Sequence, residues 1–166
     1  MKTKLFAIAK ITRASGLRGE VGVRPLIRQF DDYVAKPLFV GFDESLATDV
    51  KLEKVTGENK RRRFLFREFK TRDDAESMIG QLLFASISDK DPINLIAPDL
   101  LGATVVSDNG EIIGELSDMM SLPANDVYVI NRGKKEILIP VVPEIVRGVD
   151  AKMGVITISP MDGLID

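Results

Sequence analysis

The stretch Ser15-Gly16-Leu17-Arg18-Gly19-Glu20 decides the fold of the first half of this 166-residue chain. It joins residues 5–13 and 20–28, two segments rich in β-branched side chains whose pattern repeats at every second residue. A period of two is typical of β-strands. The two glycines, three positions apart, supply the positive φ angles that a tight turn requires. The sequence therefore predicts two strands joined by a short turn that carries Arg18.

Two interpretations of this turn stay open. Glycine-rich turns are common, so the local chemistry taken alone favours a plain strand connection with a solvated arginine. In the second interpretation, a rigid turn presents Arg18, backed by Arg13 and Arg24, to an anionic partner. Two interpretations of the basic run Lys60-Arg61-Arg62-Arg63 also stay open, because a solvated hairpin tip and an RNA contact explain it equally well.

The composition is that of an ordinary globular protein, with 45% hydrophobic and 29% charged residues. No apolar run approaches the roughly 18–20 residues that span a bilayer. The basic start, Met1 to Lys4, is not followed by the apolar core of a secretory signal. The chain has neither Cys nor His, and so lacks the usual thiolate and imidazole groups for catalysis and metal binding. We expect a soluble cytoplasmic protein with no cofactor, no metal and no membrane association.

Charge is spread unevenly along the chain. Residues 1–93 carry 18 Lys and Arg against 14 Asp and Glu, whereas residues 94–166 carry 5 against 11. Such asymmetry suggests two units with different partners. The basic half suits a polyanion, and the acidic half suits a basic protein surface.

The rest of the first half predicts a small closed barrel. Residues 29–33 break the strand pattern and are expected to form a loop or a short helical turn. Thr71, followed by acidic residues, predicts a helix that ends at Gly80. Further strands are expected at 37–42, 50–55, 62–69 and 81–87. About six strands and one short helix are typical of a small barrel.

The second half also predicts a small barrel, after a linker that contains Pro92 and Pro98. Gly114 is expected at a bulge, and Pro143 is expected to start one helical turn over 143–149. Strands are expected at 100–107, 111–121, 127–131, 136–142 and 152–159. The fold class is therefore all-β, with two small barrels at 1–88 and 99–166 and a linker at 89–98.

Catalysis has little support in the sequence. Ser15 has no histidine to activate it, and the acidic pair at 73–74 is explained by the first turn of a helix. Gly16-x-x-Gly19 is not followed by the Lys-Ser/Thr of a phosphate-binding loop. The basic residues are a better signal, because arginine binds phosphate with two parallel hydrogen bonds. Phe64 and Phe66 could stack on bases, but their alternation with polar residues favours the core.

Several motifs, taken together and in order, resemble the RimM family. In the first half these are Gly16 to Val21, then Arg24-Pro25-Leu26, then Thr71 to Glu76 with Gly80. The second half resembles a PRC-barrel through Asp99-Leu100-Leu101-Gly102, Gly110-Glu111-Ile112-Ile113-Gly114, Ala124-Asn125-Asp126-Val127, Ile137-Leu138-Ile139-Pro140 and the terminal Gly163-Leu164.

The resemblance implies a late assembly factor for the bacterial small ribosomal subunit, built from a translation-factor-like barrel and a PRC-barrel. It implies a monomer that binds the immature head through ribosomal RNA and small-subunit ribosomal protein nineteen, promotes maturation and RNA processing, and performs no covalent chemistry. The candidate contacts to RNA or the ribosome are Arg13, Gly16, Leu17, Arg18, Gly19, Glu20, Arg24, Lys60, Arg61 and Arg62, and those to the ribosomal protein are Leu95, Ile96, Asn125 and Asp126.

The chain departs from the family pattern at two places. Ser15 stands where the family usually has histidine, and Leu95 and Ile96 stand where many members have an aromatic pair. Two other function classes remain as alternatives: a PRC-barrel adaptor for a non-ribosomal partner, and an enzyme that acts on RNA.

Overall fold

The computed structural model describes residues 2–159, and the chain divides into two compact units, the first ending at Asp89 and the second beginning at Lys90. Both units are built mainly from β-strands, so the all-β prediction is confirmed. The motif Gly163-Leu164 lies outside the described residues. No helix in the described part of the chain has the length and apolar character needed to cross a membrane.

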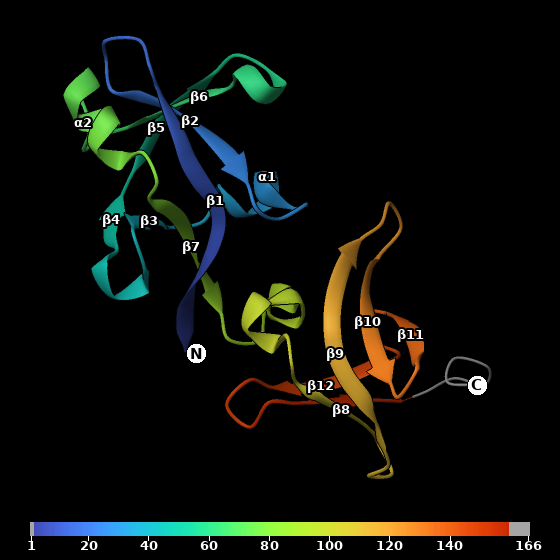
Figure 1. Cartoon of the computed structure of the whole chain (residues 1–166). Helices are drawn as coiled ribbons and strands as arrows, with labels where there is room; N and C mark the ends of the chain where they lie inside the picture. The colour runs from blue at the N-terminus through green and yellow to red at the C-terminus, as the bar shows by residue number, and fades with distance from the viewer. Residues whose placement is uncertain (1, 160–166) are drawn as a thin grey trace. The chain divides into compact units, whose positions relative to one another are not determined.

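The first unit is a barrel-like sheet in the order β4-β3-β7-β1-β2-β6-β5 (Figure 1). Only Lys51 separates β4 from β5, the two strands at the ends of this order, so the chain passes directly from one edge to the other. The described strands of this unit are β1 (Thr3–Ser15), β2 (Glu20–Pro25), β3 (Leu38–Gly41), β4 (Thr48–Val50), β5 (Leu52–Thr56), β6 (Arg63–Phe66) and β7 (Leu82–Ser88).

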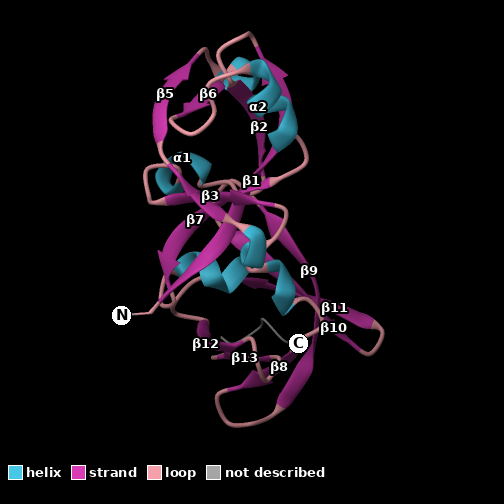
Figure 2. Ribbon diagram, turned by 90° about the vertical axis from the view of Figure 1, so that its left-hand side faces the viewer, coloured by secondary structure: helices cyan, strands magenta, loops and turns pink. Residues whose placement is uncertain are grey.

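Short helices connect these strands. The expected helix is α2 (Arg72–Met78), and its start is a capping box. The Asp74 N–H donates to the Thr71 hydroxyl at 3.1 Å, and the Thr71 N–H donates to the Asp74 carboxylate at 3.3 Å. Both views show α2 beside the turn between β1 and β2 (Figures 1 and 2). The remaining short helices are α1 (Phe30–Tyr33), η1 (Glu44–Leu46) and η2 (Asn59–Arg61).

Aromatic side chains fill the core of the first unit. Phe64 and Phe66 are 1% and 0% exposed, which confirms their prediction as core residues. The Phe30 ring meets the Phe64 ring edge to face, with the centroids 5.8 Å apart. Burying a phenylalanine side chain contributes about 1.5–3 kcal/mol to stability. These rings are therefore used for packing and are not available to stack on bases.

The second unit is a sheet in the order β11-β10-β9-β8-β13-β12, in which β8 and β13 run parallel. Gly114 lies at a bulge, as predicted: Val105 pairs with Gly114 and Val106 with Ile112, which leaves one extra residue on β9. A Cβ on Gly114 would lie 2.3 Å from the Asn131 carbonyl oxygen. The described strands are β8 (Thr104–Ser107), β9 (Ile112–Ser121), β10 (Asp126–Arg132), β11 (Lys135–Pro140), β12 (Val146–Asp150) and β13 (Val155–Ile158).

Two expected elements of this unit are wrong in part. The strand expected at 100–107 begins only at Thr104, because Leu100 ends a 3-10 helix, η4 (Pro98–Leu100). The helical turn expected over 143–149 stops after one turn. There the Val146 N–H donates to the Val142 carbonyl at 2.9 Å, and Val146 then pairs with Ile158 in the sheet.

The segment expected as a linker, 89–98, contains the 3-10 helix η3 (Pro92–Ile96). The Asp91 carboxylate caps this helix by accepting the Ile93 N–H at 2.9 Å, and Ile93 is buried. The Tyr128 hydroxyl donates to the Leu95 carbonyl. The segment is thus tied to β10 of the second unit by a partly buried hydrogen bond.

The turn between β1 and β2 depends on a close backbone approach. Gly19 has a φ of +91°, and a Cβ there would lie 2.4 Å from the Phe69 carbonyl oxygen. Gly16 also has a positive φ, +75°, but the nearest atom to a Cβ there is a side-chain oxygen at 3.8 Å. Only Gly19 therefore needs glycine both for its backbone angle and for space.

We predict that Gly19→Ala lowers the free energy of unfolding more than Gly16→Ala. Both variants incur the left-handed backbone penalty of about 1–2 kcal/mol, but only Gly19→Ala must also push Phe69 away. Urea denaturation of both variants measures the difference, which we expect to exceed about 1 kcal/mol, in the range of small-to-large changes at packed sites. Equal losses would show that the approach to Phe69 is not a constraint.

We predict that Tyr128→Phe lowers stability by about 1–3 kcal/mol at pH 7, because it leaves a partly buried carbonyl without its donor. Burial raises the pKa of the Tyr128 phenol, and the Asp126 carboxylate raises it further. The phenol ionises near pH 10 in the unfolded chain, so the wild-type protein loses this stability as pH rises above about 10. Denaturation at pH 9 and pH 11 should therefore show a steeper loss for wild type than for the variant, and equal slopes would contradict the assignment.

Candidate nucleic-acid interface

The turn of residues 16–19 stands at one end of the first unit, with Leu17 81% exposed and Arg18 also exposed. Its base is held from two sides. The Arg72 Nη1 donates to the Gly16 carbonyl at 3.2 Å, and the Thr56 hydroxyl donates to the Glu20 carboxylate at 3.4 Å. The turn is therefore a fixed support for an exposed arginine side chain.

Arg72 and Phe69 contribute to this site and are missing from the candidates drawn from sequence. Arg72 begins α2, and its Nε also donates to the Glu76 carboxylate at 3.0 Å, four residues along the helix. The only sequence signal for Arg72 is its place in the Thr71-to-Glu76 motif. Nothing in the local pattern indicates that the start of a helix supports a turn 56 residues earlier.

Arg13 serves the packing of the barrel. Its guanidinium lies across Gly22, where a Cβ would fall 2.2 Å from the Arg13 Cζ. The Arg13 Nη2 donates to the carbonyls of Lys60 at 3.1 Å and Arg62 at 3.2 Å. Arg13 thus joins the tip of the β5–β6 hairpin to β1 and β2.

Arg62 is also engaged within the unit. It forms an ion pair with Asp31 at 2.5 Å. Its Cζ lies 5.4 Å from the Phe30 ring centroid and 5.6 Å from that of Phe64, which are distances of cation–π contact. Its neighbours Lys60 and Arg61 are exposed on η2, and Arg24 is exposed on β2.

The basic candidates fall into two separate groups. Val21 of β2 pairs with Phe64 of β6 in antiparallel register, so the chain before Phe64 runs toward Arg24 and away from the 16–19 turn. Figure 1 shows the β1–β2 turn and η2 at different corners of the first unit. One group is Arg18 on the 16–19 turn, and the other is Arg24 on β2 with Lys60 and Arg61 on η2.

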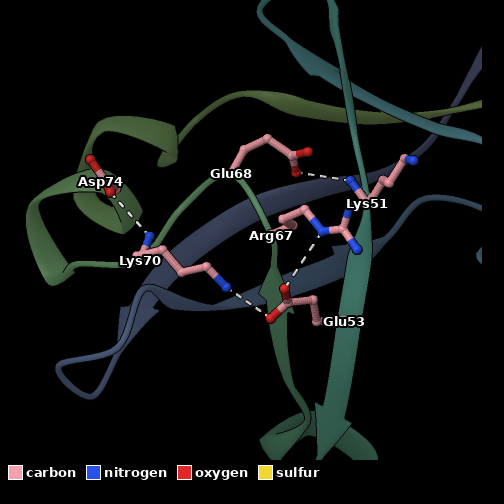
Figure 3. Close-up of polar contacts among 6 residues, drawn as sticks. All are labelled: Lys51, Glu53, Arg67, Glu68, Lys70 and Asp74. Carbon is pink, nitrogen blue, oxygen red and sulfur yellow. Dashed lines mark hydrogen bonds and ion pairs between the residues drawn. The ribbon is translucent and has the colours of Figure 1, made fainter.

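A network of charged side chains lies next to the segment that supports the turn (Figure 3). The Glu53 carboxylate pairs with the Lys70 Nζ at 2.8 Å and with the Arg67 Nε at 3.8 Å. The Lys51 N–H donates to the Glu68 carboxylate at 2.9 Å. Exposed pairs of this kind contribute about 0–1 kcal/mol each. The single negative charge of Glu53 therefore offsets only part of the positive charge of Arg67 and Lys70.

The candidate protein contacts of the second unit differ in exposure. Asn125 is exposed in the β9–β10 turn, where its carbonyl accepts the Leu122 N–H at 3.1 Å. Asp126 is only 9% exposed; its carboxylate accepts the Ser121 hydroxyl at 3.1 Å, and its carbonyl accepts the Val141 N–H at 2.8 Å. Leu95 and Ile96 are half-buried on η3. Asp126 is thus placed to hold the turn, and Asn125 is exposed at its surface.

Within residues 2–159, no group of three or more acidic, His or Cys side chains is arranged to hold a metal ion. What the described geometry offers is exposed arginine and lysine on rigid supports, which suits the binding of phosphate groups.

Comparison with known proteins agrees with the two-unit architecture. The RimM N-terminal domain matches residues 6–90, and the RimM PRC barrel domain matches residues 97–164. Proteins named ribosome maturation factor RimM are similar over nearly the whole chain. The relative from Finegoldia magna is 32% identical (96% of this chain, 98% of the relative), that from Caldanaerobacter subterraneus is 30% identical (96% and 98%), and that from Geobacter metallireducens is 26% identical (99% and 97%).

A crystal structure of a 16S ribosomal RNA processing protein RimM from Pseudomonas aeruginosa is 20% identical, with a TM-score of 0.45 over 95% of this chain and 98% of that one. The two domain matches together cover most of the chain, and the relatives match along almost their full length. The chain therefore belongs to the RimM family.

Proposed function

We propose that this chain is a non-catalytic assembly factor that binds the head of the immature small ribosomal subunit and promotes its maturation and the processing of its RNA. The proposal places it in the cytoplasm as a monomer, with head ribosomal RNA and small-subunit ribosomal protein nineteen as partners. Family membership and the names of the relatives support the ribosomal role.

The observation that carries the RNA contact is the exposed Arg18 on a turn held by Arg72 and Gly19. A side chain or turn that is already ordered in the free protein loses less conformational entropy on binding. A guanidinium can bind a phosphate with two hydrogen bonds, and each phosphate neutralised makes the affinity depend more steeply on salt. Arg24, Lys60 and Arg61 supply a second set of cations for a neighbouring stretch of RNA.

The second unit suits a basic protein. Residues 94–166 carry 11 acidic against 5 basic side chains, and complementary charge speeds association and selects the partner. Asn125 on an exposed turn and the half-buried Leu95 and Ile96 offer one polar contact and two aliphatic ones. The resemblance to the family places Leu95 and Ile96 at the positions of its usual aromatic pair, so we assign these two aliphatic contacts a smaller share of the binding energy.

The mechanism is a shift of population. A factor that binds the near-native conformation of the head better than its alternatives stabilises that conformation by the difference in binding free energy. Release follows when maturation changes the bound surface. No step requires a nucleophile or a general base, in keeping with a chain that has neither His nor Cys.

We predict that Arg18→Ala weakens binding to free small subunits by about 5- to 50-fold, the range expected for loss of one or two charge-assisted hydrogen bonds. The slope of log K against log salt should also fall by about one. The matched control is Arg147→Ala on β12, which removes the same charge from an exposed position in the acidic unit. Both variants should keep the wild-type urea midpoint, because the side chains of Arg18 and Arg147 are both exposed.

Sedimentation with purified subunits measures the affinities of both variants. If Arg18→Ala and Arg147→Ala bind equally well, the turn is not a contact. Turnover of an RNA substrate by the purified protein would instead favour an enzyme, and retention of a non-ribosomal protein with no binding to subunits would favour the adaptor.

A further inference from the structure

Among the large apolar side chains that are exposed on the first unit, three lie near one another and belong to neither basic group. Phe42 is 60% exposed just after β3, Leu46 is 62% exposed at the end of η1, and Ile79 is 42% exposed just after α2. We call these three residues the Phe42 patch. Large exposed apolar groups that lie together often mark interaction sites.

The backbone brings the members of the Phe42 patch together. A Cβ on Gly80 would lie 3.9 Å from the Phe42 Cε1, so the phenyl ring rests against the residue that follows Ile79. Gly41 pairs with Leu82, which aligns the end of β3 with the start of β7. The 42–47 loop folds back so tightly that a Cβ on Gly41 would lie 2.6 Å from the Ala47 Cα.

The loop that carries Phe42 and Leu46 is rigid and anionic. The Asp43 carboxylate accepts the Ser45 hydroxyl at 2.6 Å and the Leu46 N–H at 3.0 Å. These hydrogen bonds lower the pKa of Asp43, so it stays ionised. The patch is thus displayed on a fixed, negatively charged turn.

The chain around the patch is acidic although the first half as a whole is basic. Residues 37–50 contain Asp43, Glu44 and Asp49 but no Lys or Arg. On the side of Ile79, Asp74 belongs to the capping box and Glu76 is paired with Arg72, so the acidic charge beside the patch comes mainly from the 42–49 segment. An apolar centre with an acidic rim is the reverse of a phosphate-binding surface.

We propose that the Phe42 patch is a docking site for a Lys- and Arg-rich protein segment that carries one apolar anchor side chain. The anchor would pack on Phe42 and Leu46, and a cation of the segment would pair with Glu44, which is exposed on η1. An arginine of the segment could also stack on the Phe42 ring. Charge complementarity selects this partner, because RNA would bring phosphates to an acidic rim.

A second copy of this chain is a poorer occupant. A two-fold contact places the same surface on both sides of the interface, and would therefore set the acidic rim of one copy against that of the other. The inference does not depend on the proposed role of Arg18, since the patch and the 16–19 turn involve different residues.

The test uses the full chain and a fluorescent twelve-residue peptide with one central phenylalanine among lysines and arginines. Anisotropy should show binding that weakens as salt rises, and that weakens at least fivefold when the peptide's phenylalanine becomes serine. Phe42→Ser and Glu44→Lys should each weaken binding at least fivefold. The matched controls are Ile112→Ser and Asp108→Lys, which also replace an exposed apolar side chain by serine and an exposed acid by lysine, but in the second unit; they should leave binding unchanged.

Leu46→Ser replaces Phe42→Ser if the latter lowers the urea midpoint. No binding at millimolar peptide, or binding that the patch variants and the controls change equally, would overturn the proposal. Displacement of the peptide by an RNA hairpin that loses affinity for the Phe42→Ser protein would overturn it in favour of a nucleic-acid site. Self-association that Phe42→Ser abolishes would overturn it in favour of a second copy.

Discussion

The contact between the 16–19 turn and the backbone at Phe69 is the constraint on which the candidate RNA site depends. Gly19 can approach the Phe69 carbonyl only because it has no Cβ. The capping box of Thr71 and Asp74 starts α2 at Arg72, which then reaches back to the Gly16 carbonyl. Arg18 is therefore positioned by contacts made during folding, so the turn is already ordered before a partner binds and loses less conformational entropy on binding.

Charge in the first unit serves two purposes that a count of residues does not separate. Arg13 and Arg62 hold the β5–β6 hairpin tip to the barrel, so their charges stabilise the fold. Arg18, Arg24 and Lys60 are exposed and remain available to a polyanion. The acidic segment at Phe42 gives the same small barrel a surface of opposite charge, and we therefore propose RNA and a basic protein as partners of different residues of one domain.

The strands and α2 could be predicted because their signals are local: alternation along each strand, a Thr cap and acids in the first helical turn. Errors arose where a distant partner decides the conformation. Val146 leaves its helical turn because Ile158 offers a strand to pair with, and Pro98 sets a 3-10 helix where an apolar run suggested a strand. The roles of Arg13 and Arg72 were not predictable either, since each bonds a carbonyl more than 45 residues away in the chain.

Co-sedimentation of the purified protein with free small subunits, free large subunits and joined ribosomes, at increasing salt, tests the central claim most directly. Immature subunits from an assembly-impaired strain complete the set. The account predicts binding to small subunits alone, strongest for the immature particles and weakened as salt rises, because phosphate contacts release counterions. Absence of binding to every particle, or binding that salt does not affect, would contradict it.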